Sequence, residues 1–393
     1  MAERILVIAE IGCGPPYYGN RARMRSLLAE LRALGYSIDF AGVRFSAEEK
    51  SATLPHIDRW VYSFEESTVA FFWRRRKWEL QQRLRGSTSP VANLDRWFKP
   101  SWLDEARTLQ ARENYSRVLV AYAYHSAFLD AFTASCRKIL DAHDTLSGRH
   151  EMIESAGVGK FWFSCREEEE RLGLARADVV LAIQDEEAEV FGKLLHGKTE
   201  VRVVGHFVEP CEIPENSEAA QRIGYIGAYN PLNLQGLQWF LREVWPAVRR
   251  EIPAACLIVA GSICEKLKPR PGIELLGRVR NAAQAHADFL VSINPMPSGT
   301  GLKVKTVEAM ACGRPVVATP AGCAGLRAYR EQGLIEANDA ASFAEAVLTW
   351  LRDPAEARRH GKLARHAVED FNQRSRKELQ AALGAQTAYG EGR

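Results

Sequence analysis

The sequence predicts an α/β protein made of two doubly wound, Rossmann-like domains. Short apolar runs typical of buried strands alternate with longer segments of helical spacing, from Ile5–Ala9 near the start to Val316–Ala318. The length of 393 residues also suits two domains of ~200 residues each. A linker with two prolines over 206–217 divides an amino-terminal domain at 1–208 from a second domain at 218–371.

The composition is that of a soluble globular chain, with 46% hydrophobic and 26% charged residues. A net charge of +3 gives no reason to expect nucleic-acid binding by the chain as a whole. The eight cysteines include no Cys-x-x-Cys pair, which favours free thiols in a reducing cytoplasm over a zinc site or a disulfide framework. Since neither a signal-peptide core nor an apolar stretch of ~20 residues occurs, we expect a cytoplasmic protein without a membrane span.

The first domain opens with a strand at Ile5–Ala9, a glycine- and proline-rich turn, and a helix that ends before Gly35. A second strand follows at Tyr36–Val43. The turn lacks Gly-x-Gly-x-x-Gly, so we do not expect a dinucleotide site there. Among the arginines of this helix, Arg23 and Arg32 fit a solvated outer face better than Arg21 does.

Two later strands of this domain, at Val118–Ala123 and Lys138–Ala142, end close to histidines. The first runs into His125 and the second into His143-Asp144, so both histidines belong near the ligand-binding edge of the sheet. A histidine beside an aspartate can act as a general base, or it can be a hydrogen-bonded turn residue.

The remainder of the first domain reads as a charged helix, a strand, a helix and a final strand. We expect the glutamate run of the charged helix, Glu167–Glu170, to be mostly solvated. The four segments lie at Arg166–Leu174, Ala175–Ile183, Gln184–Leu195 and Glu200–Gly205.

A basic and aromatic segment spans residues 71–107. It holds nine Lys or Arg residues against four Asp or Glu, and four of the nine tryptophans. Basic side chains interleaved with aromatic rings can rest on anionic lipid headgroups, and Trp73, Leu80 and Leu84 form a weak apolar stripe. The composition also suits a polyanionic acceptor, nucleic acid bound by stacking, or a helix whose arginine stems cover apolar surface. We favour a peripheral membrane or lipid-linked acceptor contact through 71–102, and expect no nucleic-acid partner.

The second domain is predicted from five apolar strands and the helices between them. Beyond Leu326, we expect helices at Asp339–Leu351 and Ala355–Phe371, and a separate terminal helix near Arg374–Leu383. The five strands lie at Arg222–Ile226, Cys256–Gly261, Ile273–Leu276, Phe289–Ile293 and Val316–Ala318.

The loop between the last two of these strands carries the strongest chemical signal. Gly299 and Gly301 leave the backbone amides open to a ligand, and a helix beginning near Lys303 adds its amino-terminal dipole. The two lysines, Lys303 and Lys305, suit phosphate, while Glu308 shares a helix face with Lys305 and could accept ribose hydroxyl protons. The alternative is a surface loop with two solvated lysines.

This stretch, GTGLKVKTVEAMACGRPVVATP, resembles the donor-binding signature of group 1 (family 4-like) GT-B glycosyltransferases. The resemblance implies two Rossmann-like domains facing across a cleft, with a terminal helix at ~372–393 packing back on the first. It also implies a nucleotide-sugar donor, retention of anomeric configuration and no metal or other cofactor. The acceptor, a glycan, a lipid-linked sugar or a small molecule, would lie mainly on the first domain.

The resemblance also assigns roles to residues. Thr300 stands where many members have a glutamate, and the turn at 228–233 lacks the usual Arg and Lys, so the lysines must carry the charge. His125 fits a histidine that contacts the donor sugar in the family, and His143 and Asp144 lie in a motif of this branch; with Lys305 they form the catalytic candidates. The donor-binding candidates are Gly19, Arg21, Gly227, Asn233, Arg278, Val279, Ser298, Gly299, Thr300, Gly301, Leu302, Lys303, Lys305 and Glu308.

Two other functions fit the same residues. A nucleotide-sugar epimerase on this fold would bind the same donor and need no acceptor. A non-catalytic glycosyltransferase-like scaffold is suggested by Thr300 and by the missing Arg and Lys.

Overall fold

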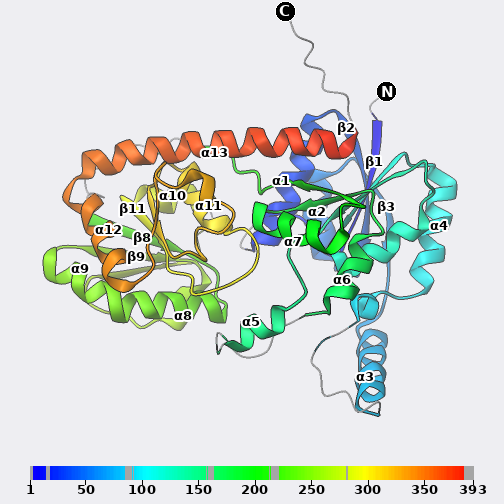
Figure 1. The fold of residues 1–393 in the computed structure, drawn as a ribbon, viewed down its shortest axis with the longest axis horizontal. Coiled ribbons are helices and arrows are strands. Elements are labelled where there is room, and N and C mark those ends of the chain that lie inside the picture. The colour runs from blue at the N-terminus through cyan, green and yellow to red at the C-terminus, as the bar shows by residue number, and fades with distance from the viewer. Residues whose placement is uncertain are drawn as a thin grey trace, which may run out of the picture. The chain divides into compact units, whose positions relative to one another are not determined.

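The computed structural model describes residues 3–14, 18–84, 91, 93–155, 157, 163–211, 213, 221–279 and 282–384. Pro15 and Pro16 of the first turn, Arg85 of the basic segment, residues 212 and 214–217 of the predicted linker, and residues 385–393 lie outside these ranges. The chain forms two compact units (Figure 1). The first comprises 1–151, 161–206 and 375–393, and the second comprises 152–160 and 207–374.

The first unit is built on a seven-stranded sheet of parallel strands in the order β3-β2-β1-β4-β5-β6-β7. Its inner strands are almost completely buried on both faces, as expected for a parallel sheet covered by helices. The strands are β1 (Glu3–Ala9), β2 (Tyr36–Val43), β3 (Arg59–Phe64), β4 (Arg117–Ala121), β5 (Arg137–Asp141), β6 (Val179–Ala182) and β7 (Glu200–Val203).

Helices connect these strands, and α3 projects away from the sheet of its unit (Figure 1). They are α1 (Gly19–Ala33), α2 (Ala47–Thr53), η1 (Leu54–His56), α3 (Thr68–Leu84), η2 (Leu94–Trp97), α4 (Ser101–Glu113), η3 (Ala123–Ala131), α5 (Arg149–Ser155), α6 (Glu167–Leu174) and α7 (Asp185–Leu195). The basic and aromatic segment therefore divides in two. Trp102 on α4 is fully buried in the core, whereas Trp73 on α3 is 66% exposed, and the side chain of Trp78 lies outside the described part.

One sequence expectation for this unit was wrong, and another holds for all but one of its residues. Arg23 is only 2% exposed, and it donates to the buried Asp141 carboxylate and to the carbonyls of Val204 and Gly205. In the glutamate run, Glu167 and Glu168 are exposed as expected, whereas Glu170 is buried and accepts hydrogen bonds from the backbone N–H groups of Leu146 and Ser147. Both charges are tolerated because each one finds its partners inside the unit.

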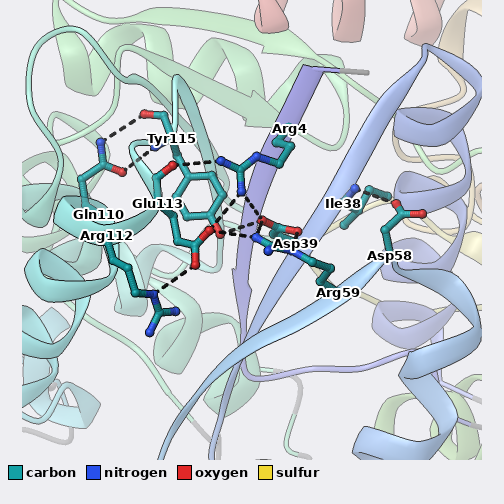
Figure 2. A network of polar contacts seen from close by, with 9 residues as sticks. All are labelled: Arg4, Ile38, Asp39, Asp58, Arg59, Gln110, Arg112, Glu113 and Tyr115. Atoms are coloured by element: carbon teal, nitrogen blue, oxygen red, sulfur yellow. Dashed lines mark hydrogen bonds and ion pairs between the residues drawn. The ribbon is translucent and has the colours of Figure 1, made fainter. Parts of the chain in front are cut away.

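A polar network closes the amino-terminal edge of the same sheet (Figure 2). The fully buried Asp39 accepts from the Tyr115 hydroxyl at 2.7 Å and from Arg59 at 2.6 and 2.9 Å. Arg59 and Arg4 also reach Glu113, at 2.9 and 3.0 Å. Hydrogen bonds from these arginines, chiefly from Arg59, lower the pKa of Glu113 to about 2, so Glu113 is ionised at neutral pH.

The second unit contains a six-stranded parallel sheet in the order β10-β9-β8-β11-β12-β13. Its strands are β8 (Arg222–Ile226), β9 (Cys256–Ala260), β10 (Ile273–Gly277), β11 (Val291–Asn294), β12 (Val316–Ala318) and β13 (Leu334–Glu336). Its helical elements are α8 (Pro231–Trp239), η5 (Phe240–Val244), α9 (Trp245–Glu251), η6 (Ser262–Lys266), α10 (Ala282–Ala287), α11 (Val304–Ala311), η7 (Arg327–Tyr329), α12 (Ala340–Arg352) and most of α13 (Pro354–Leu383).

Helix α13 corrects a further expectation. The two helices predicted at the end of the chain are one continuous helix of 30 residues. Its last turns belong to the first unit, where Arg376 pairs with Glu30 of α1 at 2.7 Å. Among the described helices, α13 included, none is both long enough and apolar enough to cross a membrane.

Candidate functional site

The glycine loop of the second unit joins β11 to the amino terminus of α11. Gly299 and Gly301 adopt φ angles of 136° and 72°, a region that side chains disfavour. The Lys303 ammonium turns back into the loop and donates to the carbonyls of Gly299, Thr300 and Gly301 at 3.1, 2.8 and 2.7 Å. With Lys303 only 5% exposed, its main observed role is to fix the loop shape and orient the amides.

Lys305 is the second residue of α11 and connects three elements. Its Nζ is 2.5 Å from the Asn233 Oδ1 of α8 and 3.2 Å from the Tyr225 hydroxyl of β8. Asn233 is itself held by a 2.7 Å bond from its Nδ2 to the Ala228 carbonyl. Burial of the ammonium, reinforced by the charge of Lys303, lowers the pKa of Lys305 to about 7. A ligand anion would therefore favour the charged form of this lysine.

The other residues predicted to bind the donor in this unit lie around the amino termini of α8 and α11. Gly227 directly follows β8, and its carbonyl lies so close to Gly261 that a Cβ on Gly261 would be 2.2 Å from the carbonyl oxygen. Ser298 has a buried Oγ without a hydrogen-bond partner among the described residues. Glu308 is half-buried on α11, and Leu302 is buried beside the loop. Farther out, Arg278 is 57% exposed and pairs with Glu265 at 3.0 Å, next to the half-buried Val279.

In the first unit, Gly19 and Arg21 lie where α1 begins. Gly19 is the first residue of the helix. Arg21 pairs with Glu49 of α2 at 2.6 Å, and its guanidinium approaches the Tyr18 ring at 5.5 Å. The guanidinium is partly exposed, so it can still meet a ligand while Glu49 holds it.

The two predicted histidines both lie at the carboxyl edge of the first sheet, but neither side chain is exposed. His125 is completely buried, and its Nε2 lies 3.0 Å from Oε2 of Glu10. His143 is buried with a φ of 63°, and its Nε2 lies 3.1 Å from Asp141. The following residue, Asp144, pairs with Arg149 at 3.0 Å.

An aromatic row links these histidines. Tyr122 stacks on His143 with ring centroids 4.1 Å apart, and it also stacks on Tyr124 at 4.9 Å. Tyr124 in turn meets His125 edge-on at 4.8 Å. The row therefore fixes both rings, and it favours a positioning role for the histidines.

Sequence reasoning missed three charged residues that gather around His125. Glu10, Arg44 and Glu66 each follow directly, or by two positions, the end of a strand: β1, β2 and β3. Arg44 contacts Glu10 at 2.5 Å and Glu66 at 3.6 Å. A usable signal was present in the sequence, because a charged residue follows each of these strands, and parallel strands bring their ends together.

The comparisons with known proteins identify the second unit. Residues 220–353, which run from β8 into the end of α12, match the family model described as glycosyl transferases group 1. The second unit is a group 1 glycosyltransferase domain. The glycine loop, α11 and the Lys305 contacts all lie inside the matched region.

A curated relative also resembles part of the chain. It is 33% identical over 138 residues to an uncharacterized 44.6 kDa protein in the cps region of Klebsiella pneumoniae. That match covers 32% of this chain and 35% of the relative, so it spans about a third of the relative's length.

The structural likeness extends over nearly the whole chain. Sucrose-phosphate synthase from Thermosynechococcus elongatus is 16% identical, with a TM-score of 0.68 over 98% of this chain and 100% of that one. The S. aureus TarM G117R mutant in complex with fondaparinux, α-GlcNAc-glycerol and UDP is 11% identical, with a TM-score of 0.67 over 97% and 99%. Anabaena Alr3699/HepE in complex with UDP-glucose is 16% identical, with a TM-score of 0.59 over 96% and 99%. The chain has the GT-B fold that its sequence predicts.

Proposed function

We propose that the protein transfers a glycosyl unit from a nucleotide-diphosphate sugar to a glycan, lipid-linked or small-molecule acceptor. The reaction would retain the anomeric configuration and require no metal ion. The observation that carries the proposal is Lys305, an ammonium held between α8 and β8 at the start of α11, inside the region that matches the family model. Because the TarM and HepE structures named above hold UDP or UDP-glucose, a uridine nucleotide sugar is the first donor to test.

The chemistry follows from where charge develops. As the bond from the anomeric carbon to the diphosphate breaks, negative charge grows on the departing phosphate oxygens. Lys305 and the amides of the loop from Gly299 to Lys303 can stabilise that charge. An oxygen of the leaving phosphate then takes the proton of the acceptor hydroxyl on the same face of the sugar, so no side-chain base is needed.

A panel of nucleotide sugars tests the proposal through release of nucleoside diphosphate, with and without an extract of lipid-linked acceptors. Lys305→Ala should suppress release at saturating donor, while Lys362→Ala, at an exposed lysine on α13, should leave it unchanged. Turnover of a sugar nucleotide into its epimer without any acceptor would identify an isomerase instead. A folded protein that binds none of the donors in calorimetry would contradict the proposal and favour a scaffold.

We further propose that α3 contacts an anionic membrane surface. Val69, Phe72, Trp73, Leu80 and Leu84 are all at least half exposed, and Arg75, Arg76 and Lys77 are exposed on the same helix. Apolar side chains beside cations suit the interface of a bilayer that carries anionic lipids. A Trp73→Ala, Leu80→Ala double variant should co-sediment less with phosphatidylserine vesicles than the wild type does. Equal co-sedimentation would contradict this contact.

A further inference from the structure

Four neighbouring strands of the first unit end in one charged network. Glu10 follows β1, Arg44 follows β2, Glu66 follows β3, and His125 follows β4 on η3. The sheet order β3-β2-β1-β4 places these strands side by side. Arg74 of α3 completes the network by pairing with Glu66 at 2.7 Å.

Glu10 is the member of this network with the accessible anion. Its side chain is 25% exposed, whereas those of His125 and Glu66 are 0% and 3% exposed. Oε1 accepts from Nη2 and Nε of Arg44 at 2.5 and 3.1 Å, and Oε2 faces His125 at 3.0 Å. Each oxygen of an ionised carboxylate can accept two hydrogen bonds, so Arg44 fills Oε1, and Oε2 keeps capacity for one ligand donor.

The electrostatics keep Glu10 ionised. Burial alone would raise the pKa of Glu10, but the hydrogen bond from His125 and the charge of Arg44 outweigh it and bring the pKa to about 2. Burial lowers the pKa of His125, so at neutral pH the ring is neutral and donates its Nε2 proton to Glu10. A carboxylate with so low a pKa is a poor general base and a good hydrogen-bond acceptor.

We infer that Glu10 binds a hydroxyl group of the acceptor through Oε2, with His125 and Arg44 as positioning residues. This inference rests on the proposed transferase function, and it assigns acceptor binding to the first unit. Ligands of parallel α/β sheets bind at the carboxyl ends of the strands, and Glu10 lies at that edge. The buried charges around it are costly unless they serve to hold a group in place.

The chemistry of the site also selects a class of acceptor. The one acceptor position left on Oε2 suits a hydroxyl group, as in a sugar or in glycerol. A phosphate or a uronate at the same point would meet the negative charge of Glu10. The part of the acceptor that meets Glu10 is therefore a neutral sugar or polyol.

Saturation-transfer NMR on the full-length protein, with UDP present, tests this assignment. The probes are the methyl glycosides of glucose, galactose and mannose, and glycerol. Wild type should bind at least one of them, and Glu10→Gln should weaken that binding about tenfold or more, because a hydrogen bond to a charged group is lost. The same change should raise the acceptor KM and leave UDP-glucose affinity in calorimetry unchanged.

Glu113→Gln is the matched control. Glu113 is also held by two arginines with a pKa of about 2, but it lies in the network at the opposite edge of the sheet (Figure 2). This variant should leave probe binding unchanged. Equal binding by wild type and Glu10→Gln, equal losses in both variants, or no binding of any probe would overturn the assignment. If the wild type does not bind the donor, the proposed function is refuted instead. Glu10→Gln does not test donor binding.

Discussion

Binding of a nucleotide sugar should draw a proton onto Lys305. In the free protein the pKa of this lysine is about 7, because the ammonium is desolvated and lies near Lys303. A diphosphate within hydrogen-bond reach would stabilise the charged form and return the pKa toward 10.5, the ordinary lysine value. Affinity should therefore be constant below about pH 6 and weaken as pH rises through 7, by about tenfold at pH 8.

The same shift has the opposite sign for the stability of the ligand-free protein. In the unfolded chain Lys305 titrates near 10.5, so between pH 7 and pH 10.5 the unfolded state binds more protons than the folded state does. The contribution of Lys305 to stability should therefore rise with pH across this window, while donor affinity falls. Few other groups would move these two quantities in opposite directions.

Calorimetry with UDP-glucose at pH 6, 7 and 8, in buffers of different ionisation enthalpy, measures both affinity and proton uptake. A nucleotide sugar is the right probe because its internal diphosphate keeps a constant charge over this range. Lys305→Met should abolish the pH slope and the uptake, whereas Lys362→Met should keep both. An affinity that does not change with pH in the wild type, or an equal slope in Lys305→Met, would refute the reasoning.

Three further predictions concern stability and structure. Asp39→Ala should destabilise the first unit by about 3 kcal/mol, since it leaves buried donors unpaired, and a urea midpoint equal to that of the wild type would contradict this. Gly236→Ala should weaken donor binding, because its Cβ would lie 2.2 Å from the Pro295 carbonyl beside the glycine loop, whereas Gly192→Ala on α7 meets nothing and should leave binding intact. The thiols of Cys211 and Cys312 lie 2.8 Å apart, so oxidised glutathione should join them, with two glutathione thiols released and two hydrogen atoms lost from the protein mass. An unchanged intact mass would show that this pair does not react.

The sequence predicted the sheets well where a strand is buried on both faces. Arg222–Ile226 has the same bounds as β8, since a parallel strand between two helical layers is apolar throughout. The edge strand β3, RWVYSF, was not predicted, because its half-exposed residues form no apolar run. Buried inner strands can therefore be predicted from their apolar composition. An edge strand is defined by its pairing, which only the folded chain shows.

Side-chain partners were harder to predict than positions. Arg23 lies four residues before the buried Leu27, so the sequence indicates that it belongs to the inner face of the helix. Its partner Asp141, however, is 118 residues away. Lys303 was correctly placed at the start of the loop helix, yet the direction of its ammonium is decided by three carbonyls of the loop itself. His125 was correctly placed at a strand end, but its complete burial depends on packing against Trp102 and Glu10, which lie far away in the chain.

The functional residues at the strand ends of the two sheets carry opposite charges, so each unit suits a different substrate. The second unit offers Lys305, helix amino termini and loop amides, which attract a diphosphate and donate few groups useful to a hydroxyl. The first unit offers the ionised Glu10, which accepts hydroxyl protons and would repel a diphosphate. Under the proposed function, exchanging the two charges would leave each unit unable to bind its own substrate, and this gives a physical reason to expect the acceptor and the donor on different sheets.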